Sequence, residues 1–285
     1  MCPKQYYFGY VLKVKRPTNQ ALYFGRKFDE TLNYNYGNKR ITDHDLPADD
    51  LKDFFRTGWE AEKEQVEHWE GEDPDGLKEL GTKGVDEFAK EVTPAVHIEE
   101  VQPKFQMTFK QSNVVLTGIP DFVERCGTIG DNKTSGRSYD ENKILQAHQP
   151  VIYSLSKDWN SDKPREVRYD VLVKTKKPKV QQLKLLVTKE YRDAELQYLA
   201  NVVEWIRSML ASKNFPPTAF HRGGWECGYC PYNDMCRKVT GLPIPQPKTK
   251  PEPLPKKYVE INEKLLQQAV QEEKQIKEVM RSIIV

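Results

Sequence analysis

The chain has 285 residues, of which 38% are hydrophobic and 30% are charged, with a formal net charge of +2. No apolar run approaches the ~20 residues that cross a bilayer, and no secretory signal pattern opens the chain, so we expect a soluble, cytoplasmic protein without a membrane partner. Residues 1–100 carry 14 basic and 21 acidic side chains, a net of −7, whereas residues 101–285 carry 30 and 21, a net of +9. The second half therefore suits a polyanionic partner, although a solvated surface would give the same asymmetry.

The first third of the chain is predicted to be helical. Residues 21–34 place Leu22, Phe28 and Leu32 at the spacing of one helix face. Apolar residues between positions 51 and 69 recur at helical spacing among Asp and Glu, which predicts a surface-facing helical insertion of about residues 42–92. We expect this insertion to contribute packing and no chemistry.

After Pro94 the pattern becomes extended. Four short β-type runs separated by turn residues predict a meandering sheet, and two further strands follow a helix. A long helix then carries one apolar stripe, which is typical of packing. The predicted strands are residues 95–101, 105–109, 113–118, 122–128, 166–174 and 182–187, and the predicted helices are residues 143–155, with a bend at Pro150, and residues 189–212.

The last part of the chain changes character again. Residues 241–258 are rich in Pro and Lys and are typical of a semi-rigid linker. Residues 259–285 predict a separate helix whose apolar positions approach a heptad pattern broken by Glu272. This helix could dock on its own domain or on a partner. The predicted organisation is a domain of residues 1–240, a linker and a C-terminal helix.

Two carboxylates and one lysine stand out near the middle of the chain. Alternate residues of a strand share a face, so Asp131 and Lys133 project together, and a hairpin through residues 124–128 brings Asp121 beside them. Adjacent carboxylates repel unless a cation lies between them, and oxygen ligands suit Mg²⁺ or Mn²⁺. A nearby lysine can orient water or neutralise a phosphorane, which is the chemistry of phosphodiester hydrolysis. The alternative is a solvated strand edge, because Asp-x-Lys is common by chance.

Two polar residues follow on the next predicted helix. Gln149 and Tyr153 are four positions apart and therefore lie on one helix face. They could reach the same cleft or contact a nucleotide strand. The turn of residues 174–179 is basic and could follow phosphates.

Three of the five cysteines lie within ten residues, as Cys227, Cys230 and Cys236. Without secretory features, metal binding is favoured over disulfides. A fourth ligand must come from elsewhere, and His221 would complete a Cys₃His zinc site. Cys126 lies between the acidic motifs and is expected to be a small buried residue.

The order Gly-x-x-Asp, Asp-x-Lys and Gln-x-x-x-Tyr resembles the motifs of the RecB-type PD-(D/E)XK nucleases over most of residues 2–238. The resemblance implies that Asp121, Asp131 and the backbone carbonyl of Asn132 bind the metal and that Lys133 assists the attacking water. The family also has a helix with a glycine and, four residues on, a metal-binding histidine. Here Gly25 is followed by Asp29, which is still a competent oxygen ligand. Asp29 could equally be a surface residue of that helix.

Cys2 resembles the first cysteine of the iron–sulfur members of this family, the AddB-type and CRISPR-adaptation exonucleases. In those proteins one N-terminal and three C-terminal cysteines hold a [4Fe–4S] cluster, which implies Cys2, Cys227, Cys230 and Cys236 here. Structural Zn²⁺ is the alternative. Relatives usually have a short Ser- and Tyr-containing helix before this cysteine, so we expect the chain to be truncated or fragmentary at its start.

Together these features predict an α/β fold: a restriction-endonuclease-like PD-(D/E)XK core, with a mixed central sheet flanked by helices, a helical insertion and an iron–sulfur region. The implied activity is a Mg²⁺- or Mn²⁺-dependent DNA exonuclease acting on single-stranded ends, with catalytic residues Asp121, Asp131, Lys133, Gln149 and Tyr153. Its setting would be DNA repair, recombination, phage replication or CRISPR adaptation, with a helicase or recombination partner on the C-terminal helix. The alternatives are an endonuclease and a non-catalytic DNA- or helicase-binding iron–sulfur module.

Overall fold

The computed structural model describes residues 2–109, 113–156, 162–218, 224, 226–245 and 254–284, with side chains as far as residue 276. The chain divides into two compact units: a larger unit, Gln20–Glu204, and a terminal unit that joins Met1–Asn19 to Trp205–Val285. The division into residues 1–240, a linker and a C-terminal helix stays a prediction. No helix in the described ranges is both long and apolar enough to cross a membrane.

A five-stranded mixed sheet forms the centre of the larger unit, with the strand order β1-β4-β5-β6-β7. Strands β5 and β6 are parallel, and the other neighbouring pairs are antiparallel. Parallel neighbours need a crossover connection, which the chain supplies between residues 136 and 164. The strands are β1 (Ile98–Val101), β4 (Phe122–Glu124), β5 (Ile129–Ser135), β6 (Arg165–Val173) and β7 (Lys179–Val187). The sequence prediction of a mixed central sheet flanked by helices is confirmed.

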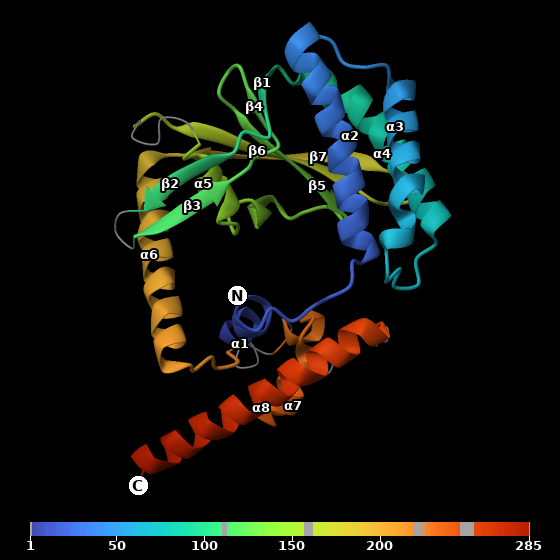
Figure 1. The fold of residues 1–285 in the computed structure, drawn as a ribbon. Helices are drawn as coiled ribbons and strands as arrows, with labels where there is room; N and C mark the ends of the chain where they lie inside the picture. Colours follow the sequence, from blue (N-terminus) through green and yellow to red (C-terminus); the bar gives the residue numbers. More distant parts are fainter. Residues whose placement is uncertain are drawn as a thin grey trace. The chain divides into compact units, whose positions relative to one another are not determined.

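Three helices cover one face of this sheet (Figure 1). They are α2 (Gln20–Thr42), α3 (Ala48–Glu62) and α4 (Pro74–Glu91). Their contact with the sheet is strongly aromatic, because Phe24, Phe28 and Trp59 are fully buried with Phe122 of β4. Fully burying each such side chain stabilises the fold by about 1.5–3 kcal/mol. The helices of the predicted surface insertion are therefore part of the main core.

The other sheet face packs against α5 (Gln149–Tyr153). Val151 and Tyr153 of this short helix join the valines of β6 in a second buried cluster. The hairpin of β2 (Phe105–Phe109) and β3 (Val114–Gly118) forms a separate two-stranded sheet on which Tyr153 also rests. The crossover between β5 and β6 therefore runs over the face to which Asp131 and Lys133 belong.

Two sequence predictions about this region are wrong. The first four strands do not meander, because β1 pairs with β4 and the β2–β3 hairpin lies outside the main sheet. The helix predicted for residues 143–155 is reduced to a 3₁₀ turn, Glu141–Lys143, and α5. Pro150 occupies the first turn of α5, where its missing N–H costs nothing, so it starts the helix and does not bend it.

The apolar helix faces predicted from the sequence are only partly correct. Helix α2 is longer than predicted, and Leu22 is 66% exposed while Tyr23 and Phe24 are buried. Helix α6 (Lys189–Ser212) has the predicted bounds, but Leu210, which the sequence places in its apolar stripe, is exposed, and its buried apolar side chains are those of Ala200 and Met209. The division between the two units falls inside this helix, between Glu204 and Trp205.

The terminal unit joins the two ends of the chain around one apolar cluster. Its elements are α1 (Pro3–Tyr6), a π-helical turn (Tyr7–Val11), α7 (Asn233–Thr240) and α8 (Lys256–Ile284). Phe8, Val239 and Ala269 are buried in this cluster, and each comes from a different segment. The C-terminal helix α8 therefore docks on its own chain. This is the first of the two possibilities that its sequence left open.

Candidate functional site

The β4–β5 hairpin brings Asp121, Asp131 and Lys133 together. Asp121 directly precedes β4, and its Oδ2 accepts a hydrogen bond from the backbone N–H of Asn132 at 2.5 Å. Lys133 Nζ forms an ion pair with Asp131 Oδ2, as expected for alternate residues of one strand. The side chain of Asp131 is almost completely buried, whereas that of Lys133 is 28% exposed. The lysine therefore extends from a buried anion toward solvent.

Helix α2 adds a third carboxylate, that of Asp29. Gly25 of this helix lies against Thr134 of β5, where a Cβ would stand 3.6 Å from Thr134 Oγ1. Asp29 lies one turn further along the helix, and its Oδ2 accepts hydrogen bonds from Asn33 at 2.9 Å and from Gln102 at 3.4 Å. Its other oxygen, Oδ1, is buried and has no hydrogen-bond donor among the described residues.

The three carboxylates interact electrostatically. Burial and the nearby charge of Asp131 raise the pKa of Asp29 to about 6. Burial, followed by the charges of Asp131 and Asp29, holds the pKa of Asp121 well above its ordinary value. Burial also raises the pKa of Asp131, against the opposing effect of Lys133. Raised pKa values in neighbouring carboxylates mean that their ionised forms repel one another, and a bound divalent cation would remove this repulsion.

Gln149 and Tyr153 lie beside this group. Gln149 Nε2 donates to Tyr153 Oη at 2.6 Å, and Tyr153 Oη donates to the carbonyl of Ile119 at 3.1 Å. Burial and the charges of Asp131 and Asp121 raise the pKa of the Tyr153 hydroxyl. The helix-face prediction therefore places both side chains next to the carboxylates.

One neighbour of the site was missed by the sequence reasoning. Tyr169 of β6 lies opposite Asp131 in the parallel β5–β6 register, with the Lys133 ammonium 5.3 Å from its ring centroid. Its hydroxyl donates to Gln149 Oε1 at 3.3 Å. Tyr169 thus connects the lysine with the Gln149–Tyr153 pair. No local signal reveals this residue, because the pairing of β5 with β6 depends on the crossover.

A buried ionic network underlies the sheet on the α2 side and was also missed. Arg168 Nε lies 3.0 Å from Asp170 Oδ1, and Arg168 Nη1 lies 2.7 Å from Glu124 Oε1. Gln182 Nε2 donates to Asp170 at 2.7 Å. The signal in the sequence is Arg-x-Asp inside the apolar run of β6, since buried charges are expected to be paired.

The four cysteines of the predicted iron–sulfur site all belong to the terminal unit. Burial raises the pKa of Cys227 and Cys230, and both are raised further by the charge of Cys2. Burial and the charge of Cys2 raise the pKa of Cys236 to about 12. The charge of Cys2, from the start of the chain, therefore acts on all three cysteines near its end.

Two further sequence predictions concern Cys126 and His221. Cys126 is exposed, so the expectation that it is buried is wrong; it lies in the β4–β5 turn, with its Sγ 3.4 Å from Thr128 Oγ1. His221, the alternative zinc ligand, lies outside the described residues.

Neither group of ligands is arranged as a closed metal centre. Within the described ranges, no three His, Cys, Asp or Glu side chains converge in the geometry that holds a metal ion. The donor types nevertheless fit: three oxygen ligands with an unpartnered buried oxygen on Asp29 suit a hard cation, and four thiols suit zinc or an iron–sulfur cluster.

Comparison with known proteins identifies the family. A family model described as the PD-(D/E)XK nuclease superfamily matches residues 1–237, most of the chain. No curated protein matches the sequence significantly. The chain is similar to a crystal structure from Eubacterium rectale, provisionally named an exonuclease, with 12% identity, a TM-score of 0.41, and coverage of 76% of this chain and 89% of that chain. A similarity this distant does not bear on function. The match of the family model shows that this chain belongs to the PD-(D/E)XK nuclease superfamily.

Proposed function

We propose that this nuclease is a Mg²⁺- or Mn²⁺-dependent DNA exonuclease of the RecB/AddB type that acts on single-stranded ends. The observation that carries the proposal is that Asp29, Asp121 and Asp131 lie near enough to affect one another's charge, with Lys133 paired to Asp131. The short helix that bears Gln149 and Tyr153 lies beside them. These side chains come from four separate segments of the chain. A solvated strand edge, the alternative for Asp-x-Lys, would not explain why the Asp131 side chain is buried.

The carboxylates would hold the metal. Asp29, Asp121 and Asp131, with the backbone carbonyl of Asn132, supply the oxygen ligands that Mg²⁺ and Mn²⁺ prefer. A bound ion would supply Lewis-acid polarisation of a phosphoryl oxygen and a more acidic water. The substitution of Asp for the family histidine at position 29 adds one negative charge to the site. That charge favours a hard divalent cation and disfavours a softer metal.

Lys133 would act on the water and the phosphate. Hydrolysis joins the oxygen of water to phosphorus and breaks the bond to the leaving oxygen, while the attacking oxygen loses a proton and the leaving oxygen gains one. The Lys133 ammonium, held between Asp131 and the ring of Tyr169, can donate to the attacking water or to an equatorial phosphate oxygen. Both roles stabilise charge that develops in the transition state.

Gln149 and Tyr153 would position the DNA strand. Their side chains are linked to each other and to Tyr169, so their orientation is fixed before substrate arrives. Preorganised donors of this kind contribute to catalysis because they need no rearrangement during the reaction. The basic turn after β6, with Lys176, Lys177 and Lys179, would follow phosphates further along the strand.

A comparison of linear with circular DNA tests the exonuclease assignment. Purified protein with Mn²⁺ is incubated with end-labelled linear single-stranded DNA and, separately, with circular single-stranded DNA of similar length. An exonuclease degrades the linear strand and leaves the circle intact. Cleavage of the circle would instead assign an endonuclease, and Asp131→Asn is the control for a contaminating activity. Repeating the assay on duplex DNA tests the preference for single strands.

We also propose that Cys2, Cys227, Cys230 and Cys236 hold a [4Fe–4S] cluster that joins the two ends of the chain. Support comes from the placement of all four cysteines in one unit, where the charge of Cys2 raises the pKa values of the other three. Deprotonated thiolates are the ligands that such a cluster needs. Since these thiols belong to a different unit from the carboxylates, we assign the cluster a structural role.

An anaerobic preparation distinguishes the metals at the cysteine site. A brown protein with broad visible absorption and about four iron and four sulfide per chain is expected for a [4Fe–4S] cluster. A colourless protein that contains one zinc ion per chain would show that the cysteines hold a structural zinc ion and not an iron–sulfur cluster. The RecB/AddB assignment also predicts a neighbouring helicase, recombination or CRISPR gene, with α8 as the contact to that partner.

A further inference from the structure

A residue with a strained backbone lies next to the carboxylates, at the end of strand β1. Gln102 follows Val101, the last residue of β1, and has a φ of 45°. This left-handed conformation is uncommon for residues other than glycine. The next residue is Pro103, and proline normally restricts the residue before it to an extended conformation. The backbone at Gln102 therefore adopts a conformation that costs free energy and that the surrounding structure must maintain.

Two hydrogen bonds connect Gln102 to residues of the proposed metal site. Its backbone N–H donates to the carbonyl oxygen of Asp121 at 2.8 Å. Its side-chain Nε2 donates to Oδ2 of Asp29 at 3.4 Å. Asp121 directly precedes β4, whereas Asp29 lies on α2. Gln102 therefore links the two segments that carry two of the three carboxylates.

A second amide holds the same oxygen of Asp29. Asn33 lies four residues further along α2, and its Nδ2 donates to Asp29 Oδ2 at 2.9 Å. Both amides thus bond to Oδ2, while Oδ1 is buried and has no hydrogen-bond donor among the described residues. A buried carboxylate oxygen without a donor is costly. The two oxygens of Asp29 therefore differ: Oδ2 has two donors, and Oδ1 is available to a cation.

We propose that Asn33 and Gln102 are positioning residues of the metal site, which hold Oδ2 of Asp29 so that Oδ1 is presented to the cation. This inference rests on the proposed metal site and adds to it the groups that orient one ligand. Carboxylates that bind a metal are commonly hydrogen-bonded themselves, and loss of such partners lowers metal affinity by about 10- to 100-fold. The strain at Gln102 is then explained, because glycine would fit the backbone better but has no side chain to reach Asp29.

The competing explanation is that Gln102 only ends strand β1, and Gln102→Gly separates the two cases. Glycine keeps the backbone N–H that bonds to Asp121 and adopts a positive φ without strain, so the variant removes only the amide at Asp29. The metal-free variant should melt at the temperature of wild type or up to about 3 °C higher. Its affinity for Mn²⁺ should nevertheless fall about 10- to 100-fold. A residue that only ends the strand would show no loss of affinity.

Affinity is measured without DNA, from the EPR signal of free Mn²⁺ during titration of the full-length protein. Asn33→Ala should weaken Mn²⁺ binding in the same way as Gln102→Gly. Asn38→Ala is its matched control, because Asn38 lies on the same helix and its amide bonds to Thr42 and His44. This control should keep the wild-type affinity for Mn²⁺.

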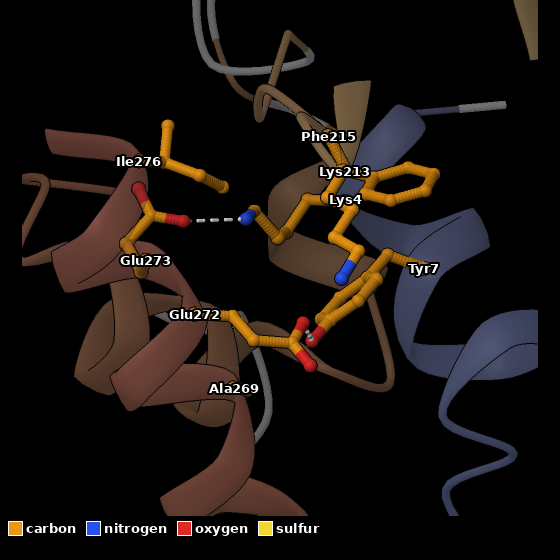
Figure 2. A pocket seen from close by; sticks show the side chains of 8 residues that line it. All are labelled: Lys4, Tyr7, Lys213, Phe215, Ala269, Glu272, Glu273 and Ile276. Atoms are coloured by element: carbon orange, nitrogen blue, oxygen red, sulfur yellow. Dashed lines mark hydrogen bonds and ion pairs between the residues drawn. The ribbon is translucent and has the colours of Figure 1, made fainter. Parts of the chain in front are cut away.

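Lys213→Gly is the matched control for the relief of backbone strain. Lys213 has a φ of 52° and follows α6, at a position where a left-handed residue is usually glycine. It belongs to the terminal unit, where it lines a pocket together with Lys4 and Glu273, whose ion pair is 2.7 Å long (Figure 2). Lys213→Gly should be at least as stable as wild type, and its affinity for Mn²⁺ should not change.

A double-mutant cycle tests whether the amides act through Asp29. Asp29→Asn alone should weaken Mn²⁺ binding, and Gln102→Gly added to it should cause no further loss. Wild-type affinity in either Gln102→Gly or Asn33→Ala, or a further loss in the double variant, would overturn the inference and leave the metal site intact. A wild-type protein that does not bind Mn²⁺, or an Asp29→Asn variant that binds it equally well, would instead refute the proposed ligand, and the inference with it.

Discussion

Replacement of Asp29 by asparagine should stabilise the metal-free protein. The pKa of this carboxyl is about 6, against an ordinary value of 3.8, because burial and the charge of Asp131 disfavour its ionised form. A difference of about two pKa units corresponds to about 3 kcal/mol of lost stability once the group is ionised. Asparagine keeps the shape and removes the charge. We therefore expect Asp29→Asn to raise the free energy of unfolding by about 2 kcal/mol above pH 6. The gain is smaller than 3 kcal/mol because the shift of Asp29 is coupled to the titration of the neighbouring carboxylates.

The pH dependence has a definite sign. Between about pH 4 and pH 6 the folded protein keeps a proton on Asp29 that the unfolded chain has released, so stability falls as the pH rises through this window. The variant should lose the part of this fall that Asp29 contributes and keep the part that comes from the raised pKa values of Asp121 and Asp131. It should also lose most of the stabilisation that Mn²⁺ gives wild type, because a ligand of the cation is gone.

Denaturant unfolding at pH 5 and pH 8, with and without Mn²⁺, measures these effects. Asp50→Asn is the control, because it makes the same substitution at an exposed carboxylate of α3. This control should be neutral or slightly destabilised. If Asp29→Asn is less stable than wild type at pH 8 without metal, or if Mn²⁺ stabilises both proteins equally, Asp29 does not belong to a cation site.

Three further predictions concern the remaining groups. Lys133→Met should lower kcat by about 10²- to 10⁴-fold with little change in DNA affinity, and a fall in affinity alone would place the lysine in binding. Tyr169→Phe should lower kcat by less than about tenfold, because phenylalanine keeps the ring beside the lysine and loses only the hydrogen bond to Gln149. Tyr169→Leu should lower kcat more, because it also removes the ring. Equal losses in the two variants would show that the ring does not contribute to catalysis. Cys236→Ser should lose metal and melt earlier, whereas Cys126→Ser should match wild type in both measurements.

Local signals in the sequence gave several elements correctly. The bounds predicted for β2 and α6 coincide with those observed, because turn residues flank the strand and a 24-residue periodic segment forms the helix. Asp131 and Lys133 could be placed together for the same reason, since strand alternation is a local property. Gln149 and Tyr153 follow from helical spacing in the same way.

Long-range arrangements could not be predicted in this manner. The pairing of β1 with β4 and the parallel pairing of β5 with β6 depend on how the faces of the whole sheet are buried. The position of Tyr169 opposite Asp131 follows from that parallel register, so it was missed. The contact between Lys4 and Glu273 joins the two ends of the chain and leaves no trace in local spacing.

Asp29 shows how the two kinds of information combine. Its sequence position, four residues after Gly25, suggested a ligand only through resemblance to a family that has histidine there. In the fold, Gly25 lies against Thr134 and thereby lets α2 approach β5. The charge of Asp29 then acts on Asp121 and is itself affected by Asp131. Asp29 is therefore near Asp121 and Asp131 because α2 packs against the sheet.

The central claim is that the carboxylates around Asp131 and the adjacent Lys133 form the catalytic centre. The most direct test is hydrolysis of end-labelled single-stranded DNA by wild type and by Asp131→Asn in the presence of Mn²⁺, with Asp50→Asn on the exposed side of α3 as the control. The account predicts that Asp131→Asn loses at least about 10²-fold in rate while Asp50→Asn matches wild type. Equal hydrolysis by all three proteins would contradict it.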